Sequence, residues 1–200
     1  DLREVWDRFI ESHRDIFRVY TKLRIQQGNI IEADTEIIVN PTGTIHQPGT
    51  MVSSAIFSAA GRELVEECEK LQDLQGYLDF RITGSGRLKC EKIFHIHGAN
   101  LFMNDPSTGL SDCYIHILAK CNELNIRSLA TPVIGTGGGS FDIAPACHIA
   151  VTATSGTIFV SKGNCPDIVI ICFDEEHYDT FCRKYIWKLR SMKDYIKEIK

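Results

Sequence analysis

Several features that would point to a membrane or secreted protein are missing from the sequence. No stretch of its 200 residues approaches the roughly 20 consecutive apolar residues that a membrane-spanning helix requires. The first residues, Asp1–Glu4, lack the basic and then apolar pattern of a secretory signal. They also lack an initiator Met, so we expect a segment of a longer protein. We expect no membrane partner.

Excess positive charge is also missing. Lys and Arg number 22 against 26 Asp and Glu, which gives a formal net charge of -4. A general nucleic-acid binder normally carries a basic stripe, whereas these basic residues are dispersed along the chain. We therefore expect no nucleic-acid partner, and we expect backbone amides to hold any anionic ligand.

The eight cysteines form no Cys-x-x-Cys pair. Most lie within apolar runs such as Ile170–Phe173, where Cys behaves as a small hydrophobic residue. Cys172, His177 and Cys182 span a strand end and a helix without a fourth ligand, so we expect no metal site. This cysteine usage favours reduced thiols in a cytoplasmic or nuclear protein.

Hydrophobic periodicity predicts alternating helices and strands. Helices are expected at 2–13, 53–60, 63–71, from Ser111 as the capping residue, at 143–159 and after a capping Asp174; strands are expected at 17–25, 37–39, 93–97, 129–134 and 168–173. We find no repeat and no low-complexity linker. The sequence predicts a single domain over 1–200, with an N-terminal helical extension at 1–15 and a core at 16–195.

Strands that alternate with helices predict an α/β fold with a mixed, largely parallel sheet between two helix layers. In such sheets, ligands bind at the carboxyl ends of the strands. Loops of unusual composition follow Val39, His97 and Ile134. We therefore predict a pocket between the loops at 41–52 and 135–141.

The most informative loop is Gly135-Thr136-Gly137-Gly138-Gly139-Ser140-Phe141. It follows an apolar strand and precedes a helix. Glycines let the backbone approach a ligand closely, and exposed amides beside a helix N-terminus suit phosphates. The loop is not a P-loop, because no Gly-Lys-Ser/Thr follows, and its spacing does not fit a Rossmann fingerprint. We expect Gly137 and Gly138 to donate amides to a phosphate.

Four motifs in this order resemble the macrodomain family, across about residues 17 to 190. They are Gly28-Asn29-Ile30 ahead of Ile37-Ile38-Val39-Asn40, the helical segment with Ala59-Ala60-Gly61 and Glu66-Glu67-Cys68, the strand Ile93-Phe94-His95, and Pro132–Gly137 followed by Phe141. The resemblance implies a three-layer α/β/α domain of the kind found in macrodomain-bearing ADP-ribosyltransferases. It also implies ADP-ribose as the ligand, and no cofactor.

The resemblance assigns expected ligand contacts residue by residue. Asn29 matches an Asp that accepts the adenine amino hydrogen, Ile30 supplies the adjacent amide, and Asn40 lies near the ribose remote from adenine. Phe173 resembles the aromatic that stacks on adenine, although core packing is an equal alternative. The two phosphate loops are expected at Gly49, Thr50, Met51 and Val52, and at Ile134, Gly135, Thr136, Gly137, Gly138, Gly139, Ser140 and Phe141.

Two departures from the family concern catalysis. Macrodomain hydrolases close the strand-end motif with a second Asn and follow the first glycine-rich loop with an Asp, but this chain has Gly43 and Ser53 there. Neither residue can act as a carboxylate base. His46, in the same altered loop, could substitute as an acid or base, but we expect an exposed loop histidine. His95 is expected to be a hydrogen-bonded core histidine.

Three functions remain open from the sequence. The first is a reader of ADP-ribose on mono- or poly-ADP-ribosylated proteins, without catalysis, acting as a monomeric module of a larger protein. The second is an ADP-ribosyl hydrolase that uses His46 or an ordered water. The third is a degenerate macrodomain that serves as a protein or nucleic-acid interaction surface. Gly43 and Ser53 count against the second, and the intact loop from Gly135 to Phe141 counts against the third.

Overall fold

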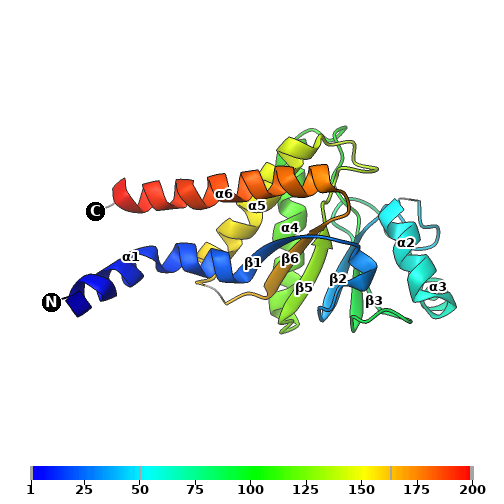
Figure 1. Cartoon of the computed structure of the whole chain (residues 1–200). Coiled ribbons are helices and arrows are strands. Elements are labelled where there is room, and N and C mark those ends of the chain that lie inside the picture. Colours follow the sequence, from blue (N-terminus) through cyan, green and yellow to red (C-terminus); the bar gives the residue numbers. More distant parts are fainter. Residues whose placement is uncertain (1, 50, 163, 199–200) are drawn as a thin grey trace.

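The computed structural model describes residues 2–49, 51–162 and 164–198 (Figure 1). The helices are α1 (Leu2–Lys22), the 3-10 helix η1 (Ile30–Glu32), α2 (Met51–Ala60), α3 (Arg62–Cys68), α4 (Pro106–Glu123), α5 (Ile143–Val160) and α6 (Glu175–Glu198). The strands are β1 (Leu23–Gln27), β2 (Ile37–Pro41), β3 (Phe80–Gly84), β4 (Lys92–Ile96), β5 (Ser128–Pro132) and β6 (Asp167–Cys172).

The strands form one sheet in the order β1-β6-β5-β2-β4-β3. Every neighbouring pair is parallel except β3 and β4, which are antiparallel. The predicted mixed, largely parallel sheet is therefore confirmed. Because β1, β6, β5, β2 and β4 run in one direction, the loops that follow them all leave the same edge of the sheet.

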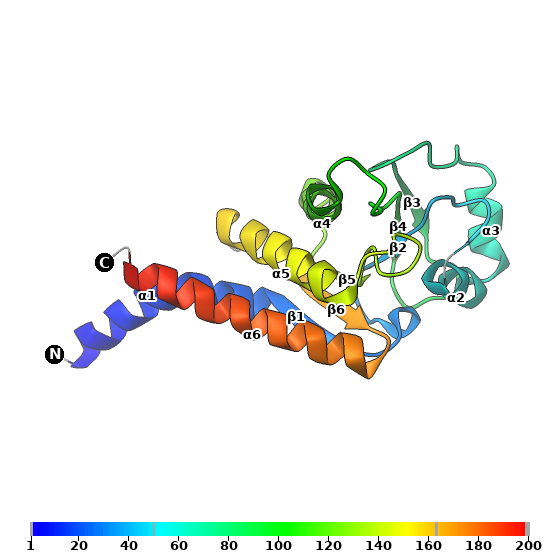
Figure 2. The same ribbon diagram turned by 90° about the horizontal axis from the view of Figure 1, so that it is seen from above.

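Each face of the sheet carries its own hydrophobic core. Alternate residues of a strand point to opposite faces, so Ile37 and Val39 of β2 pack under α4, α5 and α6. Ile38, between them, packs with Ile56 and Phe57 of α2. The two clusters make a three-layer α/β/α arrangement, as predicted, with α2 and α3 on one face and the longer helices on the other (Figure 2).

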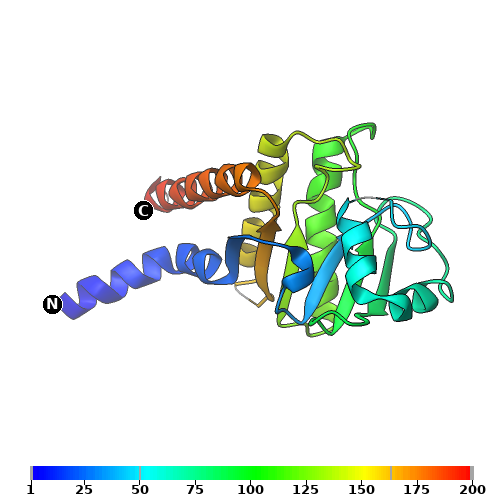
Figure 3. The same cartoon turned by 45° about the vertical axis from the view of Figure 1, so that its right-hand side comes forward.

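The two terminal helices lie side by side and project beyond the sheet in the same direction (Figures 1 and 3). The Tyr185 hydroxyl of α6 donates to the carbonyls of Val19 and Leu23, at 3.1 and 2.7 Å, where α1 passes into β1. These bonds hold the C-terminal helix against the first strand of the sheet.

Residues 17–22 correct the sequence-based interpretation. A strand was expected at 17–25, but α1 continues to Lys22 and the strand begins only at Leu23. Nothing between 13 and 22 breaks a helix, since the segment has no Gly or Pro. Ile16, Val19 and Leu23 also recur at helical spacing, and Val19 is fully buried beside α5 and α6. Residues 17–22 are therefore helical, although their apolar and polar residues alternate as they would in a strand.

Two smaller expectations also change. Helix α4 begins five residues before Ser111, and Asp105 caps it by accepting from the amide of Thr108 at 3.1 Å. Strand β3 was not predicted from the sequence. The cap expected at the last helix is confirmed, because Asp174 Oδ1 accepts from the amide of His177 at 2.8 Å.

Helix α5 corrects the expectation that no segment is long and apolar enough to span a bilayer. By length and composition alone its 18 residues would suffice. Its residues Ala146 and Ala150 are fully buried, and the helix packs against α1, α4 and α6. Packing at the centre of the helix layer accounts for its apolar character.

Candidate functional site

The candidate site lies along the carboxyl edge of the five parallel strands. Asn29 follows β1, Phe173 follows β6, the loop 135–141 follows β5 and Asn40 is the last residue but one of β2. The sheet order β1-β6-β5-β2 therefore places these groups along one edge in that sequence. Strands lie about 4.8 Å apart, so the row is roughly 14 Å long. The predicted loops 41–52 and 135–141 lie at this common edge.

The β1 and β6 end of the row offers an exposed aromatic ring. Phe173 is 72% exposed, so the core-packing alternative for this residue is wrong. The amide of Gly28 donates to the carbonyl of Cys172 at 2.9 Å, which holds the two strand ends together. Asn29 caps η1 by accepting from the amide of Ile31 at 3.3 Å. Ile30 is buried, so only its backbone is available to a ligand.

The glycine-rich loop after β5 folds tightly on itself. The amide of Phe141 donates to the carbonyl of Gly135 at 3.0 Å, and that of Ser140 donates to Gly137 at 3.0 Å. Gly135 has φ +93°, and a Cβ there would come within 2.8 Å of the Phe141 ring. A Cβ on Gly139 would lie 2.7 Å from the carbonyl oxygens of Ala99 and Gly135. These two glycines are needed for the shape of the loop.

The same loop presents unused backbone donors. Within the described part of the chain, the amides of Thr136, Gly137, Gly138 and Gly139 have no hydrogen-bond acceptor. A Cβ on Gly137 would meet nothing within 4 Å, so open space lies beside it. Phe141 is 6% exposed and packs into the core; it supports the loop from below. Backbone amides without an acceptor, in a loop with open space beside Gly137, are suited to binding phosphate oxygens.

A buried polar chain begins at the end of β2 (Asn40) and confirms that His95 is a hydrogen-bonded core histidine. The Thr83 hydroxyl donates to the carbonyl of Gly84 at 2.9 Å, so its oxygen accepts from His95 Nε2 at 2.9 Å. Burial lowers the pKa of His95 to about 4, so the ring is neutral. Its Nδ1 then accepts from Asn40 Nδ2 at 3.0 Å, and Asn40 Nδ2 also donates to the buried Ser53 hydroxyl at 3.3 Å.

This chain of bonds determines which way the Asn40 amide faces. Because Nδ2 points to His95, the carbonyl oxygen Oδ1 points the other way. Asn40 is fully buried, and its Oδ1 has no hydrogen-bond partner in the described structure. Buried polar groups are nearly always paired, so this acceptor has the character of a binding group for a donor such as a hydroxyl.

The altered loop at 42–49 is anchored from outside the site by Asp73. Its carboxylate accepts from the Thr44 hydroxyl at 2.6 Å and from the amide of Ile45 at 2.7 Å. Desolvation alone would raise the pKa of Asp73, but hydrogen bonds from Thr44, Ile45 and Leu74, with His46 nearby, hold it below its ordinary value. Ile45 is fully buried, so the loop is a packed element.

His46 is turned toward α3. Its Nε2 lies 3.2 Å from the carbonyl oxygen of Cys68 and 3.0 Å from that of Leu71, so Nε2 carries a proton and donates to both. Its Nδ1 lies 3.8 Å from the carboxylate of Asp73. Nε2 therefore faces carbonyls at and just after the end of α3, and Nδ1 faces Asp73. The ring is exposed, as expected for a loop histidine.

The expected first phosphate loop leads into α2. Gly49 is exposed, Met51 is 86% exposed, and Val52 is half-buried. Met51 and Val52 belong to the first turn of α2, whose amides have no partner within the helix. The expected contact at Thr50 falls outside the described residues.

Several structural contributors were not found by sequence reasoning. The Tyr114 hydroxyl of α4 accepts from the amide of Ile134 at 3.0 Å, which supports the start of the glycine-rich loop. Leu101 donates its amide to Gly139 at 3.0 Å from the loop that follows β4. Asp73 and Thr83 lie between predicted elements. No sequence signal marks these residues, because each acts through a partner that is distant in the chain.

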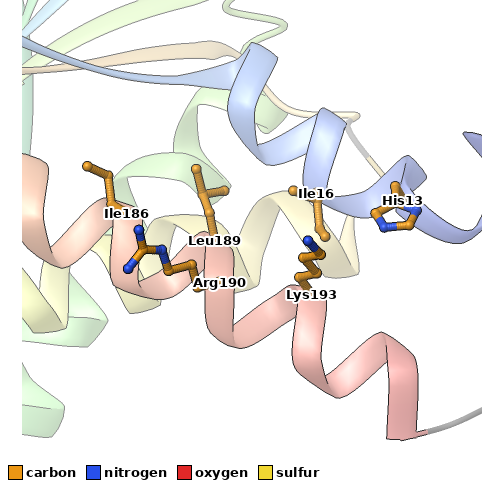
Figure 4. A pocket seen from close by; sticks show the side chains of 6 residues that line it. All are labelled: His13, Ile16, Ile186, Leu189, Arg190 and Lys193. Carbon is orange, nitrogen blue, oxygen red and sulfur yellow. The ribbon is translucent and has the colours of Figure 1, made fainter.

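A separate hollow of about 300 Å³ lies between α1 and α6, away from the loops (Figure 4). It is lined by apolar and basic side chains. The lining residues are His13, Ile16, Ile186, Leu189, Arg190 and Lys193. None of them belongs to the carboxyl edge of the sheet.

Comparison with known proteins agrees with this geometry. The Macro domain family model matches residues 39–150, which include the end of β2, the glycine-rich loop and the first part of α5.

The chain belongs to the macrodomain family.

This confirms the resemblance found in the sequence. The macrodomain is 31% identical over 163 residues to the O-acetyl-ADP-ribose deacetylase of Escherichia fergusonii, covering 78% of this chain and 91% of that protein. It is 30% identical over 145 residues to human protein mono-ADP-ribosyltransferase PARP14, covering 72% of this chain and 7% of that protein. The fold matches the Trypanosoma brucei macrodomain in complex with ADP-ribose with TM-score 0.75 and 24% identity, over 83% of this chain and 70% of that one.

Proposed function

We propose that this macrodomain binds ADP-ribose, free or attached to a modified protein, and that it acts as a reader without hydrolase activity. The order of groups along the edge supports the proposal. An exposed aromatic ring and Asn29 come first, free amides lie in the middle, and Asn40 comes last. ADP-ribose has the same order of parts: adenine with its ribose, a pyrophosphate and a second ribose.

One observation carries the proposal: the amides of Gly137, Gly138 and Gly139 have no acceptor among the described residues. Neither loop 41–52 nor loop 135–141 contains Lys or Arg, so the backbone is the donor for a pyrophosphate there. Hydrogen bonds to charged groups contribute about 1.5–3 kcal/mol each. Two or three such bonds would account for most of the affinity expected of a micromolar ligand.

The same geometry argues against hydrolysis. Gly43 has no side chain, and the Ser53 hydroxyl is buried and accepts from Asn40. Neither can act as a base toward a water at the remote ribose. His46 is committed to carbonyls at the end of α3. We infer that the site holds its ligand without activating a water.

The experiment offers the domain an ADP-ribosylated protein carrying a labelled modification on acidic side chains. Immobilised macrodomain should retain the modified protein and should not retain the same protein after chemical removal of the ADP-ribose. The label should stay attached throughout incubation. A matched column carrying Gly137→Glu should retain neither. Equal retention of modified and unmodified protein would support the third interpretation, a protein interaction surface.

A second candidate is an enzyme that removes acyl or ADP-ribosyl groups. It is favoured by the similarity to the Escherichia fergusonii O-acetyl-ADP-ribose deacetylase. Release of label, lost in His46→Ala, would establish the hydrolase that uses this histidine. Release that persists in His46→Ala would point to a water held by the Asn40 oxygen.

The cellular setting follows from the same proposal. All eight cysteines are free thiols, which supports a cytoplasmic or nuclear protein. The partners we propose are ADP-ribosylated proteins, met by a monomeric module of a longer protein. Light scattering of the purified chain checks the monomer.

A further inference from the structure

The Asn40 end of the site contains a second buried polar atom without a partner, on His97. In the described structure, His97 Nδ1 shares this status only with Asn40 Oδ1 among buried side-chain nitrogen and oxygen atoms. Both atoms belong to residues at the carboxyl ends of β2 and β4, which are neighbouring parallel strands. Asn40 is the last residue but one of β2, and His97 follows the last residue of β4.

Strand pairing brings these two residues to the same place. Asn40 pairs with His95 and Pro41 with Ile96, and the amide of Thr42 donates to the carbonyl of Ile96 at 2.9 Å. His97 therefore stands beside the start of the loop that follows Asn40. Because alternate residues share a face, its side chain lies on the face where His95 meets Phe57 of α2, with ring centroids 6.0 Å apart.

The His97 ring lies beside Gly43. A Cβ on Gly43 would lie 3.8 Å from His97 Nε2, which is ordinary van der Waals contact. The backbone of His97 is anchored on both sides, since its amide donates to Asp79 at 3.0 Å and its carbonyl accepts from Leu78 at 3.0 Å. These two bonds fix the backbone that carries the ring.

From these contacts we propose that His97 is a specificity-determining residue that recognises, together with Asn40, the hydroxyls of the ribose remote from adenine. Asn40 Oδ1 is an acceptor, so a ribose hydroxyl can donate a hydrogen bond to it. The imidazole nitrogen can accept from or donate to the adjacent hydroxyl. A vicinal diol supplies both kinds of partner, and it resolves both unpaired atoms at once.

This inference rests on the proposed function, because it names the part of ADP-ribose that reaches the β2 and β4 end of the edge. It adds His97, whose ring lies beside Gly43, to the residues expected to contact the ligand at this end of the edge. It also predicts discrimination: a ligand that ends at the pyrophosphate leaves both atoms unpaired, whereas one with a terminal ribose pairs them. A site that hydrogen-bonds hydroxyls discriminates strongly against ligands that lack them.

The experiment measures ADP-ribose and ADP affinities for wild type, His97→Val and His97→Gln by calorimetry, with thermal melting as a check of folding. His97→Val should weaken ADP-ribose about tenfold, the loss expected for one hydrogen-bonding partner, and should leave ADP unchanged. His97→Gln should recover part of the difference. The same ADP-ribose to ADP ratio in all three proteins would overturn the inference. Loss of both ligands in wild type would instead overturn the proposed function.

A measurement on the wild-type protein guards against a variant that does not fold. The ring resonances of His97 in a nitrogen-15 NMR spectrum should move on addition of ADP-ribose and remain in place with saturating ADP. Equal movement with both ligands would show that the ring responds to the pyrophosphate alone, which contradicts the assignment to the remote ribose.

Discussion

Substitution of Gly137 by Glu separates ligand binding from folding more cleanly than any other change in the site. A Cβ at this position meets nothing within 4 Å and its backbone is outside the left-handed region, so the fold should accept a side chain. The side chain would project into the open space beside the free amides. We therefore expect an unchanged melting temperature and a large loss of ADP-ribose affinity.

The size of the loss can be divided into bulk and charge. Moving the pyrophosphate off one amide costs about 1.5–3 kcal/mol, or roughly ten- to a hundredfold in affinity. A carboxylate about 5 Å from a phosphate adds about 3 kcal/mol of repulsion at an effective dielectric constant near 20, before screening by salt. Gly137→Gln has the same shape without the charge, so it isolates the first contribution.

The assay is a calorimetric titration of both variants at low and high salt. Gly137→Gln should bind ten- to a hundredfold more weakly than wild type by the estimate above. Gly137→Glu should bind more weakly still, and the gap between the two should narrow as salt screens the charge. Wild-type affinity in Gly137→Glu would refute the amide cradle. A lower melting temperature would show that the loop is less open than described.

Three further outcomes are expected. Phe173→Ala should weaken ADP-ribose by about 1–3 kcal/mol, the usual value of stacking on an aromatic ring, without a change in melting, since the ring is 72% exposed; unchanged affinity would remove Phe173 from the site. Burial lowers the pKa of His95 from 6.5 to about 4. Between these two pH values the unfolded chain binds a proton on His95 and the folded chain does not. The free energy of unfolding should therefore decrease as pH falls through this window, by on the order of 3 kcal/mol in total. Urea titrations from pH 7 to 4 measure this slope, which should flatten in His95→Gln; an equal slope in that variant would assign the effect to other groups. Asp73→Ala removes the acceptor for Thr44 and Ile45 and should lower stability by about 1–3 kcal/mol, with ADP binding retained; chemical denaturation that matches wild type would show that loop 42–49 does not depend on this anchor.

Most of the fold was accessible from the sequence because its local signals agree with its packing. The wholly apolar strand Ile37–Val39 and the Gly135–Phe141 loop were predicted where they occur. A strand was wrongly predicted at 17–22 because the apolar residues there fit both the alternation of a strand and the spacing of a helix. The packing of Val19 against α5 and α6, which favours the helix, is visible only in the structure. Strand β3 was missed because just one of its five residues is buried, so it has a weak hydrophobic pattern.

The site was only partly accessible, since its less obvious members act through neighbours that are distant in the chain. Asn40 was predicted from its motif, but its orientation depends on Thr83 and His95, which set the direction of the hydrogen bonds. His97 stands out only in the structure, because its Nδ1 is buried without a hydrogen-bond partner among the described residues. His46 stood out in the sequence as a candidate acid or base, and its contacts with α3 show a structural use instead.

We propose that successive groups along one edge of the sheet bind successive parts of ADP-ribose, from adenine to the remote ribose. Calorimetric titration of the wild-type chain with AMP, ADP and ADP-ribose tests it directly, since each ligand extends the previous one along the edge. We expect one site per chain and an affinity that rises from AMP to ADP and again to ADP-ribose. No binding, or equal affinity for AMP and ADP-ribose, would contradict it.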